Sequence, residues 1–371
     1  MWTSTRAAAE ELDRADQLSP PGPAHGEPIR LDGSSGGPRS RSTPARLRDF
    51  VENRWDLRGP RPHLEDDRER QARLAGAAIA HVIGADPAGV SVGESASMNL
   101  FNGLLTAAGL RPERPDLVIG RSCFAEDEYL ARSAADFAGR RLRLVDDVAE
   151  LPEVLDERAA VLALSHVDLI SGAVRDGRAL TELAHRHGAL ALWDLSHSAG
   201  AVRVDLRDWD ADFAIGCGHR YLGGGTGAPG FCYLSEHLRR ELLEPPARAF
   251  PGVPSALAVA ELRAGLSALT PVPAAELEEK STGLAEFFLR CLAEAPGADP
   301  APVPDEHRRG PSVCLAHKHA HYVAQALLGR GVVVDVVEPD RVRFNFAPLW
   351  LRYADVRTAA EHTREVLRDL G

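Results

Sequence analysis

Lysine is almost absent from this chain of 371 residues. The 43 basic residues include only two lysines, Lys280 and Lys318, and the others are arginine. A GC-rich coding bias is the simple explanation. The scarcity still has a chemical consequence, because a mechanism that needs an amine nucleophile has only these two side chains to choose from.

Other absences narrow the class of protein. No apolar run reaches the roughly 18 residues that a membrane span needs. The five cysteines show no CxxC spacing, so neither a disulfide framework nor a structural zinc site is expected. The net charge of −11 makes nucleic acids and anionic membranes poor partners. The N-terminus is polar and acidic and lacks the apolar core of a signal peptide, so we expect a cytoplasmic protein.

The chain itself has an ordinary globular composition, with 44% apolar and 26% charged residues. We expect an N-terminal arm over 1–55 that is rich in Pro, Gly and Ser, with helices near 5–16 and 43–55. A large α/β domain over 56–245 and a small α+β domain over 246–371 follow it. Between about 89 and 235, short apolar runs alternate with helical stretches. This alternation predicts an α/β fold with a mostly parallel sheet covered by helices, which binds ligands at the carboxyl ends of its strands.

Two hydroxyl groups stand at the start of a predicted helix in VGESASMNL, residues 92–100. Ser95 and Ser97 follow an apolar strand that ends at Gly93. Helix N-termini bind anions, so the segment predicts an anion site, with a simple N-cap as the alternative. The chain has no Walker-type glycine-lysine motif, so a nucleotide P-loop is not expected.

An acid and a histidine follow a predicted buried strand in LWDLSHSAG, residues 192–200. Asp194 could hold a protonated ring nitrogen, and His197 could support it or act as a base. The alternative is a turn-forming aspartate beside a histidine with only a structural role.

A glycine-rich segment, GCGHRYLGGGTGAPG, spans residues 216–230 and permits close approach of its backbone to a ligand. His219 and Arg220 stand at its start, and an arginine fork suits phosphate or carboxylate. A flexible loop is the alternative.

Two further segments carry candidate residues. Arg343 lies in the alternating strand RFNFAPLW, where it could bind a carboxylate bidentately or be a surface cation. His317, His319 and His321 of HKHAH would share one face of an extended segment, but the segment runs into a predicted helix, so no metal site is expected.

Together these segments resemble the kynureninases, members of the fold-type-I pyridoxal-phosphate (PLP) enzymes of aminotransferase class V. The likeness is collinear from IRLDGSSGG at 29–37 to FAPLWLRYADV at 346–356 and includes SCFAEDEY, LSHVDLISG and WDLSHSAGAVRVDL. It implies a homodimer and an amino-acid substrate whose α-carboxylate binds Arg343. It also implies the following cofactor contacts: Ser95, Ala96 and Ser97 at the phosphate, Phe124 stacked on the pyridine ring, Asp127 nearby, Asp194 at the pyridine nitrogen and His197 beside it.

The chain departs from the family at the catalytic lysine. The family's tyrosine–lysine pair corresponds to His219–Arg220, so the Schiff-base lysine position is occupied by an arginine, whose guanidinium stays protonated and offers no free amine. A segment near 244–256 that helps to bind phosphate and aromatic substrates is also shortened. Ordinary kynureninase activity is therefore not expected. Lys280, on a predicted surface helix, and Lys318 are poor replacements.

Three interpretations remain open. The first is an enzyme that binds PLP or pyridoxamine phosphate (PMP) noncovalently or as a substrate adduct, with His197 or His219 transferring protons and Arg220 with His219 holding phosphate. The second is a cofactor-independent enzyme that uses the same cleft for acid–base or condensation chemistry on a carboxylate, such as a biosynthetic step. The third is a non-catalytic binding subunit. The fold alone does not choose among them.

Overall fold

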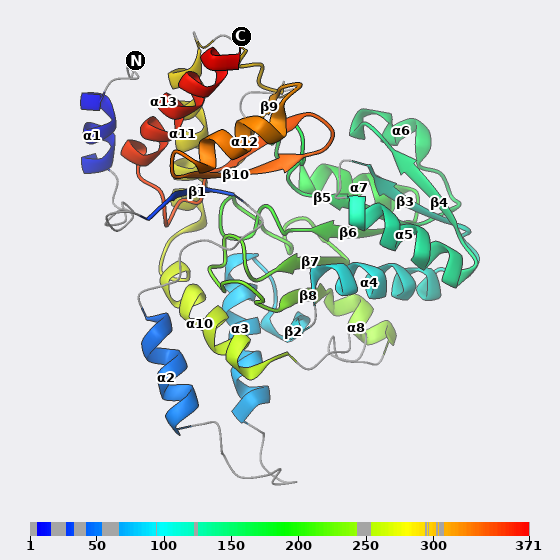
Figure 1. Ribbon diagram of the computed structural model, residues 1–371. Coiled ribbons are helices and arrows are strands. Elements are labelled where there is room, and N and C mark those ends of the chain that lie inside the picture. Colours follow the sequence, from blue (N-terminus) through cyan, green and yellow to red (C-terminus); the bar gives the residue numbers. More distant parts are fainter. Residues whose placement is uncertain are drawn as a thin grey trace.

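The computed structural model describes residues 6–15, 27–32, 42–53, 67–93, 95–121, 125–242, 254–293, 295, 297–301, 303 and 308–370. The chain builds two sheets, a seven-stranded one and a four-stranded one, each with its own helices (Figure 1). Within the described residues, no helix has the length and apolar character needed to cross a membrane.

The large sheet has the strand order β2-β8-β7-β6-β5-β3-β4. Its strands are β2 (Val90–Gly93), β3 (Asp116–Gly120), β4 (Arg141–Val145), β5 (Ala159–Ser165), β6 (Leu190–Asp194), β7 (Phe213–Cys217) and β8 (Gly230–Leu234). Strands β3 to β7 run parallel to one another, whereas β8 is antiparallel to both β7 and β2. The predicted mostly parallel sheet is confirmed, with β8 as an antiparallel strand second from one edge.

Helices cover both faces of this sheet because its strands are apolar on both sides. In β5, Val161 and Ala163 belong to the core under α4 (Ala96–Leu110) and α5 (Ala125–Ala138). Leu162 and Leu164 belong to the opposite core, under α3 (Asp67–Val82), α7 (Gly177–Arg186) and α10 (Ala256–Leu269). This period-two alternation explains why the strands read as continuous apolar runs.

The small sheet has the order β1-β10-β11-β9. Its strands are β9 (Ser312–Ala316), β10 (Val332–Val337), β11 (Arg341–Asn345) and β1 (Ile29–Leu31), which comes from the N-terminal arm and pairs in parallel with β10. Helices α11 (Ala274–Leu292), α12 (Ala320–Leu328) and α13 (Tyr353–Leu370) supply its core. The smaller α+β unit is confirmed, whereas the domain boundaries near 55 and 245 stay a prediction.

The two ends of the described chain lie together beside this small sheet (Figure 1). Helix α1 (Arg6–Ala15) packs on α13, and Asp13 accepts hydrogen bonds from the backbone N–H groups of Tyr353 and Ala354 at 2.7 and 3.1 Å. Helix α2 (Thr43–Asn53) packs instead on α10. The arm therefore contributes a strand and a helix to the smaller unit.

The remaining short elements connect these layers. They are the 3₁₀ turns at Pro87–Gly89 and Val148–Glu150 and helices α6 (Leu151–Val154) and α8 (Glu236–Leu242). The small unit meets the loop that follows β5, where the backbone N–H of Gly310 donates to Gly172 O at 2.9 Å and the Cys314 thiol to Leu169 O at 3.4 Å. It therefore lies over the carboxyl edge of the large sheet, where the candidate residues gather.

Candidate functional site

Three strands of the large sheet end at one edge, where β8 begins, and several candidate residues lie at or directly after their ends. Asp194 is the last residue of β6, Cys217 is the last of β7, and Gly93 ends β2 directly before α4. Gly230 pairs with both Gly93 and Cys217, so the start of α4 lies at the same edge as the end of β7. The sheet therefore brings together segments that are more than 100 residues apart in sequence, around Gly93 and Cys217.

The α4 N-terminus forms the candidate anion site. Ser95 is its N-cap, with the backbone N–H of Met98 donating to Ser95 Oγ at 3.2 Å. Ala96 and Ser97 are half-buried in the first turn. A Cβ on Gly230 would lie 2.8 Å from Ala96 N, so only a glycine lets β8 approach the helix this closely. The predicted N-cap is confirmed, and the anion role of Ser95 and Ser97 stays a prediction.

Asp194 is a buried carboxylate at the centre of this edge. Its side chain accepts a hydrogen bond from the backbone N–H of Ser196 at 2.9 Å. Burial raises the pKa of Asp194, against the opposing effects of the Ser196 hydrogen bonds and the Arg220 charge. Among the described residues, no salt bridge is made to Asp194. Such a carboxylate gains stability from a cationic group placed beside it.

His197 is buried next to this carboxylate, with 4% of its surface exposed. Burial lowers its pKa well below the usual value, and the charges of Arg220, Arg343 and His219 lower it further. His197 is therefore neutral near pH 7. The sequence does not show this lowered pKa, because it depends on desolvation beside cations, and the predicted role of His197 in proton transfer stays a prediction.

Cys217, His219 and Arg220 form a second group at the end of β7. Burial disfavours ionisation of the Cys217 thiol, but a hydrogen bond with His219 and the charge of Arg220 outweigh it and lower the thiol pKa. The thiol also contacts Ser196 O at 3.8 Å. His219 and Arg220 are half-buried. The charge of Arg220 acts on Asp194, His197 and Cys217, so Arg220 lies near these three residues.

Arg343 enters the site from β11 of the small sheet. Its side chain is 2% exposed, and its Nη2 donates to Asp335 Oδ2 at 3.0 Å. Asn345 Nδ2 donates to the same oxygen at 3.1 Å. The surface alternative for Arg343 is thus excluded by its burial. The sequence analysis did not identify Asp335, which the register of β10 and β11 places opposite Arg343.

The two lysines lie in different environments, one buried and one exposed. Lys280 is 5% exposed, so its predicted place on a surface helix is wrong. It lies one helical turn from the buried Leu277 and Leu284, on the face with which α11 joins the two cores. Lys318 is exposed, in the turn before α12.

Other candidate residues lie outside this cluster. Phe124 falls outside the described residues, and Asp127 is half-exposed in the first turn of α5. Of the three histidines of HKHAH, His321 pairs with Glu338 at 2.9 Å, while the Nδ1 atom of His317 accepts from the backbone of His319 at 3.1 Å. The described residues contain no group of three His, Cys, Asp or Glu side chains that could hold a metal.

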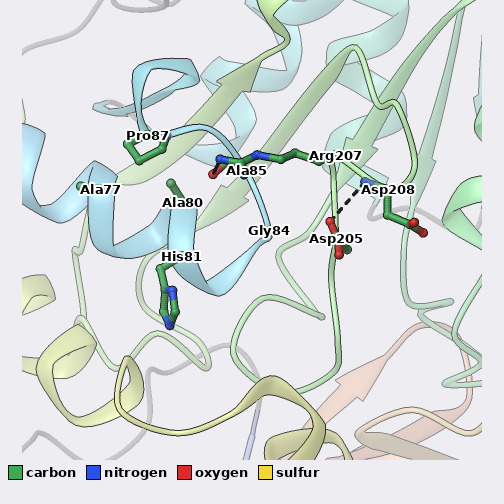
Figure 2. A pocket seen from close by; sticks show the side chains of 9 residues that line it. All are labelled: Ala77, Ala80, His81, Gly84, Ala85, Pro87, Asp205, Arg207 and Asp208. Carbon is green, nitrogen blue, oxygen red and sulfur yellow. Dashed lines mark hydrogen bonds between the residues drawn. The ribbon is translucent and has the colours of Figure 1, made fainter.

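A separate pocket of about 710 Å³ lies at the opposite edge of the sheet, near the start of β2 (Figure 2). It lies between the end of α3, at His81, and the turn that contains Asp205 and Asp208. Figure 2 shows Arg207 reaching across it, and its Nη2 donates to Ala85 O at 3.0 Å. No candidate residue from the sequence lines this pocket.

Comparison with known proteins gives the family. Residues 277–363 match the model of the kynureninase C-terminal domain. The chain is 34% identical to a kynureninase from Pseudomonas fluorescens over 98% of this chain and 96% of that protein. It belongs to the kynureninase family. The fold of this family member also resembles cysteine desulfurases from Thermococcus onnurineus (TM-score 0.79, 18% identity, covering 92% of this chain and 95% of that chain) and Escherichia coli (TM-score 0.78, 18% identity, 97% and 98%).

The resident group that this kynureninase-like fold implies is a phosphorylated pyridine. The residues present fit two of its parts. The α4 N-terminus with Ser95 suits the phosphate, and the buried, unbridged Asp194 suits the ring nitrogen. The basic residues that follow β7 directly are His219 and Arg220, and neither side chain is a primary amine.

Proposed function

We propose that this kynureninase-family chain is an enzyme that binds PLP or PMP without a covalent lysine bond and acts on an amino acid or a related carboxylate. The observation that carries the proposal is Asp194. A carboxylate buried at the carboxyl edge of the sheet, with a raised pKa and no salt bridge among the described residues, is suited to a cationic ring nitrogen.

Different residues of the chain would bind the phosphate, the ring nitrogen and the substrate carboxylate. The first turn of α4, with Ser95, would hold the phosphate, and Asp194 would keep a proton on the pyridine nitrogen. Arg343, oriented by Asp335, would bind the substrate carboxylate. The cofactor, when bound, would supply a ring that delocalises negative charge developing at the substrate α-carbon.

Proton transfer falls to His219 in this proposal. Burial keeps His197 neutral, so His197 would orient its neighbours without carrying a charge. His219 is half-buried and hydrogen-bonded to Cys217, so it reaches both the interior and the opening of the site. Its place at the end of β7 is suited to holding or moving a proton.

Arg220 would act as a fixed cation in place of the lysine. Because its guanidinium stays protonated, it would orient a phosphate or carboxylate and form no bond to an aldehyde. Its charge already acts on Asp194, His197 and Cys217, which supports a position inside the site.

A titration of the purified protein with PLP, followed by absorbance, tests the proposal. We expect saturable binding that Asp194→Ala weakens strongly and that Asp208→Ala, a change at an exposed aspartate, leaves unaltered. Without a saturable signal the proposal is lost. Binding of carboxylates without PLP would then favour the cofactor-independent enzyme, and binding of neither would favour the non-catalytic subunit.

The family also leads us to propose a homodimer. Light scattering during size-exclusion chromatography would report a mass near twice that of the 39.9 kDa chain. A monomeric mass at micromolar concentration would contradict this part of the proposal.

A further inference from the structure

Tyr221 carries a buried hydroxyl group whose role neither the fold nor the proposed cofactor contacts explain. The residue is 6% exposed. Among the residues that the structure describes, none forms a hydrogen bond with its hydroxyl. A buried polar group without a partner costs about 1–3 kcal/mol, so its retention in a folded site calls for a ligand.

The local backbone places Tyr221 inside the candidate site. The N–H of Gly223 donates to Arg220 O at 3.3 Å, which closes a turn with Tyr221 at its second position. A Cβ on Gly223, whose φ is +69°, would lie 2.9 Å from the Trp350 ring. Trp350 follows β11, the strand that carries Arg343. The turn therefore lies directly under the small-domain segment that supplies the candidate carboxylate clamp.

The charges that act on the Tyr221 hydroxyl include those of two arginines, Arg343 and Arg220. The charges of Arg343, Arg220 and Asp335 and the Cys217 thiol act on it, and burial raises its pKa, so the phenol keeps its proton. The carboxylate in this set, Asp335, already accepts from Arg343 and from Asn345 at its Oδ2 atom. Two positive charges and one full negative charge therefore act on a protonated phenol at this place, and an anionic ligand is suited to it.

We propose that the Tyr221 hydroxyl is a specificity-determining donor that binds the substrate carboxylate together with Arg343, which Asp335 and Asn345 hold in position. The inference deepens the proposed function and rests on it in one respect, that the substrate carries a carboxylate. It does not depend on how the cofactor is held. Tyr221 would select a ligand with acceptor oxygens. A neutral amide at the same place would bring its N–H groups close to the Tyr221 hydroxyl and the Arg343 guanidinium, which are donors themselves.

Binding of two small probes tests the role of Tyr221. L-Alanine and L-alaninamide differ only in the carboxylate, and their dissociation constants are measured by the rise in melting temperature, with and without PLP. We expect the wild-type protein to prefer L-alanine. Tyr221→Phe should weaken L-alanine binding about tenfold, the equivalent of one charge-assisted hydrogen bond, and leave L-alaninamide binding unchanged.

The ligand-free protein gives a second, independent measurement. Removing an unsatisfied hydroxyl should raise the melting temperature of Tyr221→Phe by about 1–3 °C. Tyr233→Phe is the matched control, since Tyr233 is also buried, at 5% exposure, but lies on β8 outside this group. We expect Tyr233→Phe to leave the preference for L-alanine unchanged.

The outcomes distinguish this inference from the proposed function. If the protein does not bind PLP but prefers L-alanine in a way that depends on Tyr221, the proposed cofactor is rejected and the carboxylate site is retained. The inference is overturned if the wild-type protein binds both probes equally or neither, if Tyr221→Phe binds L-alanine normally, or if that variant is less stable than the wild type.

Discussion

The buried ion pair between Arg343 and Asp335 allows a quantitative prediction. Their side chains are 2% and 8% exposed and lie 3.0 Å apart. Asp335→Ala leaves the guanidinium buried without this partner, and breaking such a pair costs about 3–5 kcal/mol. We therefore expect the free energy of unfolding to fall by about that amount, a large fraction of the stability of a typical domain.

Two comparison variants make this prediction specific. In Asp208→Ala, an exposed pair with Arg178 is lost, and we expect a fall of at most about 1 kcal/mol. In the double variant Asp335→Leu, Arg343→Met both charges are removed, so the protein should be more stable than Asp335→Ala alone.

Equilibrium unfolding in urea, followed by tryptophan fluorescence, measures all these differences. The reasoning is refuted if Asp335→Ala unfolds within about 1 kcal/mol of the wild type, or if the double variant is the less stable of the two. Either result would mean that the Arg343 charge is solvated or neutralised by another group.

Two further predictions concern other parts of the large domain. Buried Asp212 accepts hydrogen bonds from His185 at 2.8 Å and pairs with His237 at 2.9 Å, which raises the pKa of both histidines and lowers that of Asp212. The contribution of the two histidines to the free energy of unfolding should be complete below about pH 6.5 and be lost as the pH rises through their raised pKa values. The contribution of Asp212 should be lost in acid, as the pH falls through its lowered pKa. The difference in free energy of unfolding between the wild type and Asp212→Asn, measured in urea, should therefore be largest in mildly acidic solution. A difference that does not change with pH would contradict the account. Ser95→Ala removes the α4 N-cap and should lower the free energy of unfolding by about 1 kcal/mol. The same change should weaken the binding of PLP more than that of pyridoxal, which lacks the phosphate. Equal weakening of both would argue against a phosphate at this helix.

Much of the fold could be predicted because apolar periodicity is a local property. The predicted helices near 5–16 and 43–55 match α1 and α2 within two residues at each end. Strand direction was less accessible, since a run such as GFCYLS reads the same in a parallel or antiparallel strand. Strand β1 was missed because it has three residues and its partner, β10, lies about 300 residues further along the chain.

The candidate site could also be predicted only in part. The carboxyl ends of parallel strands meet at one edge, so the proximity of Asp194, His197 and Arg220 followed from the predicted sheet. Burial and pairing depend on the small domain, so the low pKa of His197 and the partner of Arg343 could not be predicted. Tyr221 was overlooked because its neighbours in sequence offered more reactive chemistry.

Mass spectrometry after borohydride reduction tests the central claim most directly. Wild-type protein incubated with PLP should bind it and yet keep the mass of the unmodified chain after reduction, because Arg220 offers no amine. Arg220→Lys should gain one reduced pyridoxal phosphate at position 220. A modified wild-type chain, at Lys280 or Lys318, would contradict the account, and so would an Arg220→Lys chain that stays unmodified.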